Sequence, residues 1–112
     1  MKTQSKEFLL SAGQDWQDAD EGIQRQVLGY NRQLMMVRIN FEKGAVGTVH
    51  DHPHAQASYV ASGRFKVMIN GEEKVLNKGD GFFVPPNSPH GCECLEEGML
   101  IDVFTPMRED FI

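Results

Sequence analysis

Residues 44–63 read GAVGTVHDHPHAQASYVASG and hold three of the four histidines in the chain. On an extended strand, residues two positions apart point to the same side, so His50 and His52 can present their imidazoles to one point. Pro53 then bends the chain and can bring Gln56 back toward that point. Such clustering needs a chemical reason, and a metal ion shared by these side chains supplies one.

The fourth histidine, His90, falls in a second stretch, residues 79–94, which reads GDGFFVPPNSPHGCEC. Histidine and glutamine ligands suit zinc, nickel, iron, cobalt or manganese, so we expect a divalent transition metal whose identity stays open. The alternatives are ordinary polar residues at a strand end, or a former metal site that is now a structural relic. We predict His54 to lie outside the ligand set, as an outward group or one behind the ligands. The predicted metal ligands are His50, His52, Gln56 and His90.

Short stretches whose side chains would alternate between the two faces of a strand surround these two segments. Residues 33–42 (QLMMVRINFE) alternate in a way that predicts a strand with one buried face. Asn70 and Gly71 tolerate the positive φ of a type I′ turn and indicate a hairpin. Many short strands with such turns are typical of a mostly antiparallel β sandwich or barrel. Further strands are expected at residues 58–61, 64–69, 73–76, 81–84 and 99–104, whereas residues 22–31 show no clear period.

The length and charge of the chain limit the classes of function that are expected. The chain has 112 residues, enough for one domain with one ordinary core. Its 11 basic and 16 acidic residues, a net charge of -5, lack the basic surplus that nucleic-acid phosphates require. No apolar run approaches the roughly 18 residues of a membrane span, and the polar start MKTQSKE is unlike a signal peptide. We expect a cytoplasmic protein with an N-terminal arm at 1–21 and one barrel domain at 22–112.

Cys92 and Cys94 are close neighbours, and a disulfide between them would be strained. Reduced thiols are therefore expected, although a Cys-x-Cys pair can also ligate soft metal ions. Trp16, in the acidic stretch DWQDADEG, is expected to pack the N-terminal arm onto the barrel or a partner subunit. Stacking of Trp16 on a sugar is the alternative.

The two histidine segments resemble the two motifs of the cupin superfamily. The cupin pattern is Gly-x5-His-x-His-x3 or x4-Glu-x6-Gly, then Gly-x5-Pro-x-Gly-x2-His-x3-Asn, and the chain keeps both spacings. Three positions depart from it, because Gln56 replaces Glu, Asn87 replaces Gly and Cys94 replaces Asn. Asn87 is a mild change, since asparagine tolerates positive φ. The resemblance implies an all-β, single-domain double-stranded β-helix, or jelly-roll barrel.

The change at Gln56 affects the expected chemistry. An amide oxygen is neutral, so the ion would keep its whole double charge and act as a stronger Lewis acid. The set also departs from the two-histidine, one-carboxylate triad typical of oxygen-activating iron. Oxidative chemistry is therefore less expected than Lewis-acid chemistry.

Over most of its length the chain resembles KdgF-type pectin-degradation cupins, in the segments GIQRQVLGY, FEKGAVG, HPHAQ, SYVASG, VPPNSPHG and DVFTPMREDF. The tail FTPMREDF is the most specific of these. The resemblance implies an isomerase-like enzyme that converts 4,5-unsaturated monouronates, from pectin or alginate breakdown, to linear 5-keto-4-deoxyuronate. In such a substrate, opening of the hemiacetal leaves an enol at C5, and protonation at C4 gives the ketone.

The reaction needs a Lewis acid, a proton-transfer group and a cation for the carboxylate. The resemblance implies that Asp102, Phe104 and Arg108 line the active site, where Asp102 moves a proton and Arg108 holds the carboxylate in a two-pronged pair. By alternation, Leu100, Asp102 and Phe104 share one strand face. If the other face fills the core, Asp102 is only a solvated carboxylate.

Two other functions stay open. A cupin dioxygenase would contain iron and consume oxygen, and a non-catalytic sugar-acid-binding module would need the pocket but not Asp102. Because cupins commonly pair through their outer sheets or exchange N-terminal strands, we expect a homodimer whose small-molecule partner is a sugar acid.

Overall fold

Eight strands, all paired antiparallel, make up the protein, whose computed structural model describes residues 3–112. They form one sheet in the order β1-β2-β3-β8-β5-β6, while β4 also pairs with β8 and β7 with β5. No helix in residues 3–112 is long and apolar enough to span a membrane. The strands are β1 (Gln17–Asp20), β2 (Ile23–Tyr30), β3 (Met35–Phe41), β4 (Val46–His50), β5 (Ala55–Ile69), β6 (Glu72–Asn77), β7 (Gly81–Val84) and β8 (His90–Thr105), with short 3-10 helices η1 (Ser11–Gly13) and η2 (Glu109–Phe111).

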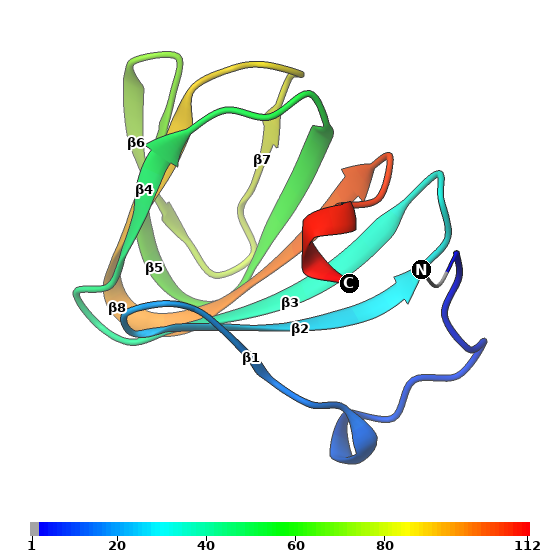
Figure 1. The fold of residues 1–112 in the computed structure, drawn as a ribbon. Coiled ribbons are helices and arrows are strands. Elements are labelled where there is room, and N and C mark those ends of the chain that lie inside the picture. Colours follow the sequence, from blue (N-terminus) through cyan, green and yellow to red (C-terminus); the bar gives the residue numbers. More distant parts are fainter. Residues whose placement is uncertain (1–2) are drawn as a thin grey trace.

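The sheet curls over on itself into a barrel, as expected for an all-β single domain (Figure 1). In the figure β1, β2 and β3 form the lower layer, β4, β6 and β7 the upper one, and the long strands β5 and β8 belong to both. The C-terminal turn η2 lies over the layer formed by β2 and β3. Strand β1 falls inside the segment expected as an N-terminal arm and pairs with β2.

The expectation of separate strands at residues 58–61 and 64–69 was wrong, because both belong to the single bent strand β5. The bend falls at Gly63, where φ is +81° and the pairing with β8 shifts register. A Cβ at Gly63 would come within 2.6 Å of the carbonyl oxygen of Glu96, so only glycine allows this close approach. Strand β8 likewise begins at His90, well before the expected start at Met99.

Residues 22–31, where the sequence shows no clear period, contain strand β2. The residues buried on β2 explain why its sequence does not alternate clearly between apolar and polar side chains. Gln26 is only 1 % exposed, donates to the carbonyl of Gln14 and accepts from Arg38 at 2.8 Å. A polar residue thus occupies an interior position of β2, and hydrogen bonds offset the cost of burying it.

The interior of the barrel holds two apolar clusters, and polar side chains lie between them. Along β5 and β8, Val60 pairs with Leu100, and both belong to the main hydrophobic core. Two residues farther along the same inner face, Ser58 pairs with Asp102, and both are buried. The two strands that carry the core therefore also carry the polar groups of the site described below.

Three turn and strand predictions are confirmed. Asn70 and Gly71 take φ of 51° and 83° in the β5–β6 hairpin, and Asn87 takes a φ of 61°. In β3, Met35 and Val37 are fully buried, as the alternation predicts.

Candidate metal centre

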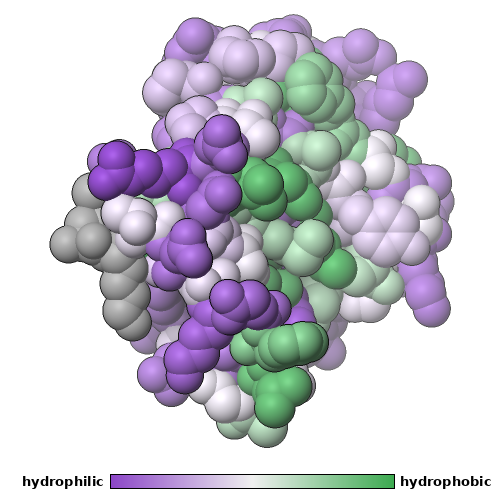
Figure 2. Space-filling view, turned by 90° about the vertical axis from the view of Figure 1, so that its right-hand side faces the viewer, coloured by the Kyte–Doolittle hydropathy of each residue, from purple (hydrophilic) through white to green (hydrophobic). Residues whose placement is uncertain are grey.

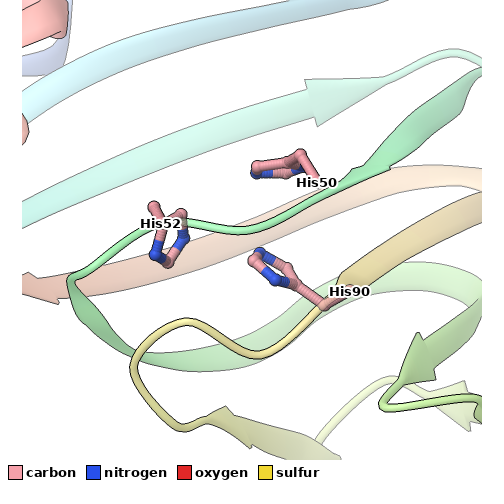
Figure 3. Close-up of side chains that lie close together, drawn as sticks. All are labelled: His50, His52 and His90. Carbon is pink, nitrogen blue, oxygen red and sulfur yellow. The ribbon is translucent and has the colours of Figure 1, made fainter.

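Three imidazoles lie close together, as Figure 3 shows. His50 ends β4, His52 follows in the next loop, and His90 begins β8 as the register partner of His50. One nitrogen from each ring lies within 4.8 Å of the nitrogens of the other two, which is the arrangement of a candidate metal site. His52 and His90 are buried, whereas His50 is exposed, so an ion would be reached from the side of His50.

Backbone hydrogen bonds fix which nitrogen of each ring can bind a metal. In all three histidines, Nδ1 lies near the carbonyl oxygen of a residue two positions away, at 2.8 Å for His50, 3.0 Å for His52 and 2.9 Å for His90. A carbonyl oxygen can only accept, so each Nδ1 carries the hydrogen and each Nε2 keeps a free electron pair. Metal-binding histidines typically donate their second nitrogen to such a partner.

Gln56 lies beside the cluster, as expected of a fourth ligand. Its side chain is buried on β5, and its Oε1 atom is 3.0 Å from Nε2 of His52. Two ligand atoms about 2.1 Å from one ion and at right angles to each other are about 3 Å apart. The donor set therefore fits a divalent transition metal, with His50, His52, His90 and Gln56 as the residues that would hold it.

Burial also favours the metal-binding form of His90. It lowers the pKa of His90 below the usual histidine value, and the neighbouring His50 and His52 act in the same direction. A neutral imidazole is the form that donates an electron pair to a metal.

His54 lies outside the three-histidine cluster. It turns inward toward the C-terminal segment, where its Nε2 donates to the carbonyl of Met107 at 3.1 Å and its ring lies 6.4 Å from that of Phe104. Burial lowers the pKa of His54, and the positive charge of Arg108 lowers it further. His54 is thus a group behind the ligands, and the alternative of an outward-facing side chain is wrong.

Asp102 lies on the inner face of β8, only 4 % exposed, in line with the buried Leu100 and Phe104. The alternative of a solvated carboxylate is therefore wrong. Ser58 donates its hydroxyl hydrogen to Oδ1 of Asp102 at 2.6 Å. Burial raises the pKa of Asp102 to about 6, although the hydrogen bond from Ser58 and the charge of Arg108 oppose the rise. A carboxyl group with this pKa can take up and release protons near neutral pH.

Arg108 lies at the mouth of the site, where its guanidinium stands over two aromatic rings, 5.1 Å from the centroid of Phe104 and 4.3 Å from that of Phe111. Its Nε and Nη2 atoms donate to the two carboxylate oxygens of Asp110, at 3.1 and 2.9 Å. Partial burial raises the pKa of Asp110, but the hydrogen bonds and charge of Arg108 outweigh this and lower it. Asp110 thus occupies the two-pronged position predicted for a substrate carboxylate.

A cavity of about 390 Å³ reaches most of these groups, although His52 and His54 do not line it, and its volume suits a small ligand. A larger hollow of about 620 Å³ on the outer side of β1–β3 is lined by none of the predicted site residues. The smaller cavity is therefore the candidate active site. Its lining includes His50, Gln56, His90, Asp102, Phe104 and Arg108, together with Arg25 and Phe111.

The cysteines do not belong to the histidine cluster. Both are free, as expected. Cys94 lies in the hydrophobic core and donates to the carbonyl of Glu96, while Cys92 lines the cavity wall. Burial raises the pKa of Cys92 to about 12, so it stays a neutral thiol. Trp16 is 37 % exposed.

Sequence reasoning missed four residues of the site, namely Ser58, Arg25, Asp110 and Phe111. Ser58 is two positions from Gln56 on one strand, so alternation could have placed both on the inner face. The guanidinium of Arg25 lies 3.9 Å from the ring centroid of Phe111, although the two residues are far apart in the sequence. No local pattern indicates a contact between residues so far apart in the chain.

Comparison with known proteins defines the class. The model of the cupin domain family matches residues 37–104, which is more than half of the chain. The chain is a cupin, with one cupin domain.

The relatives narrow the class further. The chain is 41 % identical over 109 residues to the pectin degradation protein KdgF of Dickeya dadantii (strain 3937), covering 96 % of this chain and 99 % of that protein. The chain therefore belongs to the KdgF family. The structure of KdgF from Halomonas sp. is 39 % identical and superposes with a TM-score of 0.91, over 96 % of this chain and 100 % of that one. An RmlC-like cupin from Shewanella frigidimarina NCIMB 400 is 49 % identical, with a TM-score of 0.97 over 99 % of this chain and 100 % of that one.

Proposed function

We propose that the protein is a metal-dependent enzyme that converts 4,5-unsaturated monouronates to linear 5-keto-4-deoxyuronate. The observation that carries the proposal is the placement of a buried carboxylate, Asp102, in one cavity with Arg108 and with His50 and His90 of the histidine cluster. Together these residues offer the proton-transfer group, the metal site and the cation for the carboxylate that the reaction needs. Homology to a pectin degradation protein supports a sugar acid as the substrate.

The reaction is an isomerisation that needs no other reactant. A proton leaves the hydroxyl at C1 while the bond from C1 to the ring oxygen breaks, so that C1 becomes an aldehyde. The electron pair of that bond stays on the former ring oxygen, which becomes the enolate oxygen at C5. A proton then adds at C4, and the enolate becomes the 5-ketone. Atoms and electrons balance, because one proton is lost and one is gained.

Each side chain of the site has its own role in this reaction. Asp102, with a pKa of about 6, accepts one proton and supplies one. Arg108 binds the substrate carboxylate by its Nε and Nη2 atoms, in place of Asp110. Phe104, 2 % exposed, forms an apolar wall beside Arg108 and limits the access of water. A divalent metal held by the histidines and Gln56 would supply Lewis-acid stabilisation of the oxygen that gains charge.

Product analysis tests this proposal. In D₂O, the unsaturated uronate is incubated with the metal-loaded protein and followed by proton NMR. We expect the vinyl signal of C4 to vanish and one of the two C4 positions of the product to carry deuterium, because the enzyme delivers the proton from one side. Oxygen uptake without this product would support the cupin dioxygenase instead, and binding of the uronate without turnover would support the binding module.

A second copy of the chain is the partner that the outer face favours. Across β7, β5, β8 and β3 the register aligns Phe83, Ala57, Val103 and Met36 in one row. Phe83 is 59 % and Met36 40 % exposed, and apolar rows of this kind on a sheet are typical of interfaces. Apolar side chains also gather in a band on the face drawn in Figure 2. The homodimer and the cytoplasmic location stay predictions.

A further inference from the structure

A buried chain of hydrogen bonds joins the candidate metal ligand Gln56 to Asp102. The Nε2 atom of Gln56 donates to the hydroxyl oxygen of Ser58 at 3.0 Å, and that hydroxyl donates to Oδ1 of Asp102 at 2.6 Å. The exposed fractions of the three side chains are 6 % for Gln56, 7 % for Ser58 and 4 % for Asp102. Water therefore has little access to compete for these bonds.

The direction of this chain follows from counting hydrogens. The hydroxyl of Ser58 has one hydrogen, and a carboxylate can only accept, so the hydrogen points to Asp102. The oxygen of Ser58 is then an acceptor, and it is matched by the amide N–H of Gln56 rather than by the amide oxygen. The amide oxygen of Gln56 must consequently face the other way, toward His52. In the opposite orientation an amide N–H would face the ion, and N–H groups have no free electron pair for a metal.

The same chain changes the strength of Gln56 as a ligand. Hydrogen bonds in series polarise one another, so a carboxylate at one end draws positive charge along the chain toward itself. The amide N–H bond is polarised, and electron density shifts onto the amide oxygen. The neutral amide thereby gains some of the character of the glutamate found at this position in the general cupin pattern.

We propose that Ser58 is a positioning residue that holds the amide of Gln56 with its oxygen toward the metal and connects that ligand to Asp102. The inference rests on the metal site of the proposed function but not on the substrate. It assigns Ser58 a role in metal affinity that is distinct from any contact with the sugar acid.

The test measures zinc affinity in the absence of substrate, by competition with a chromogenic chelator. Ser58→Ala removes both hydrogen bonds, whereas Ser58→Thr keeps the hydroxyl. Loss of a group that orients a metal ligand typically weakens binding by about 10- to 100-fold, which is the loss expected for Ser58→Ala. Ser58→Thr should bind zinc nearly as tightly as the wild type. Ser62→Ala, an exposed serine on the same strand, is the matched control and should not change the affinity.

Two results would overturn the proposal. One is equal zinc affinity of Ser58→Ala and the wild type, and the other is absence of zinc binding by the wild type. If zinc binds as predicted but the unsaturated uronate is not consumed, the proposed function fails and the role of Ser58 stands.

A folding defect would be separated from an affinity defect by thermal unfolding of each metal-free variant. Should Ser58→Ala fail to fold, Ser58→Val takes its place, since valine has nearly the shape of threonine but no hydroxyl to donate or accept. We expect Ser58→Val to bind zinc more weakly than Ser58→Thr, and equal affinities of these two variants would overturn the proposal.

Discussion

The Nε2 atom of His52 and the Oε1 atom of Gln56 face each other across 3.0 Å. Because Nδ1 of His52 carries the ring hydrogen, both facing atoms offer electron pairs, and a cation between them would remove their repulsion. The folded protein should therefore bind a divalent metal and be stabilised by it. At a free metal concentration 100 times the Kd, the expected gain is about 2.7 kcal/mol.

Thermal unfolding with zinc and with a strong chelator measures this gain. His90→Ala, which removes one predicted ligand, should lose most of the difference between the two conditions. A wild-type protein that melts at one temperature in both would contradict the prediction of a metal site.

Asp102 should make the metal-free protein less stable at high pH. Its pKa is raised to about 6 in the folded state, above the value of 3.8 for an unperturbed side chain, so the folded state binds the proton more tightly than the unfolded state. The unfolding free energy contributed by this group is thus greatest below pH 4 and falls as the pH rises toward 6. A shift of two pKa units corresponds to at most about 3 kcal/mol.

Urea unfolding of metal-free wild type and Asp102→Asn from pH 4 to pH 8 measures the effect. The neutral amide of Asp102→Asn does not titrate, so the wild type should lose stability relative to this variant across the interval. A difference between the two proteins that does not change with pH would show that Asp102 titrates normally.

The spacing of the histidines made the ligand cluster predictable, because spacing on strands determines which side chains meet. The barrel followed from the short strands and turns and from the resemblance to the cupin motifs. The inward position of Asp102 was not decidable from alternation, since both faces of its strand carry apolar residues. The long strand β5 was divided in the prediction because Gly63 looks like a strand end in the sequence, although in the fold it is a bend.

The contacts at the mouth of the site could not be predicted from the sequence, for a different reason. Arg25 and Arg108 approach the ring of Phe111 to 3.9 and 4.3 Å, but they come from opposite ends of the chain. Only the closure of the sheet brings β2 beside the C-terminal turn. Contacts of this kind depend on the whole fold and leave no local periodicity.

Asp110 should compete with the substrate for Arg108. Asp110→Asn removes the charge that holds Nε and Nη2 of Arg108, so the KM for the unsaturated uronate should fall. Arg108→Lys keeps a positive charge but loses the two-pronged geometry, so its KM should rise. A charged hydrogen bond is worth about 1.5 to 3 kcal/mol, which corresponds to about a 10- to 100-fold increase for Arg108→Lys.

Steady-state kinetics of both variants test this competition. The two KM values should move in opposite directions relative to the wild type. A higher KM for Asp110→Asn would mean that Asp110 orients Arg108 for the substrate rather than competing with it.

Phe83 should lie in the interface of the predicted homodimer. Phe83→Glu places a charge in the apolar row of the outer face, and burial of an unpaired charge is costly. Sedimentation equilibrium should find a dimer for the wild type and a monomer for Phe83→Glu, with the fold of the variant checked by circular dichroism. Lys78→Glu, on the loop before β7, introduces a glutamate away from this row and should stay dimeric. A monomeric wild type would contradict the homodimer.

The central claim is that metal and Asp102 act together on an unsaturated uronate, and its most direct test is the rate at which the ultraviolet absorbance of that compound disappears. The measurement compares native protein, chelator-stripped protein, the stripped protein reloaded with metal, and metal-loaded Asp102→Ala. We predict acceleration above the spontaneous rate by the native and reloaded proteins, loss of this acceleration on stripping, and a rate lower by about 100- to 10,000-fold for Asp102→Ala. Loss of absorbance at the spontaneous rate in the presence of metal-loaded native protein would contradict the claim.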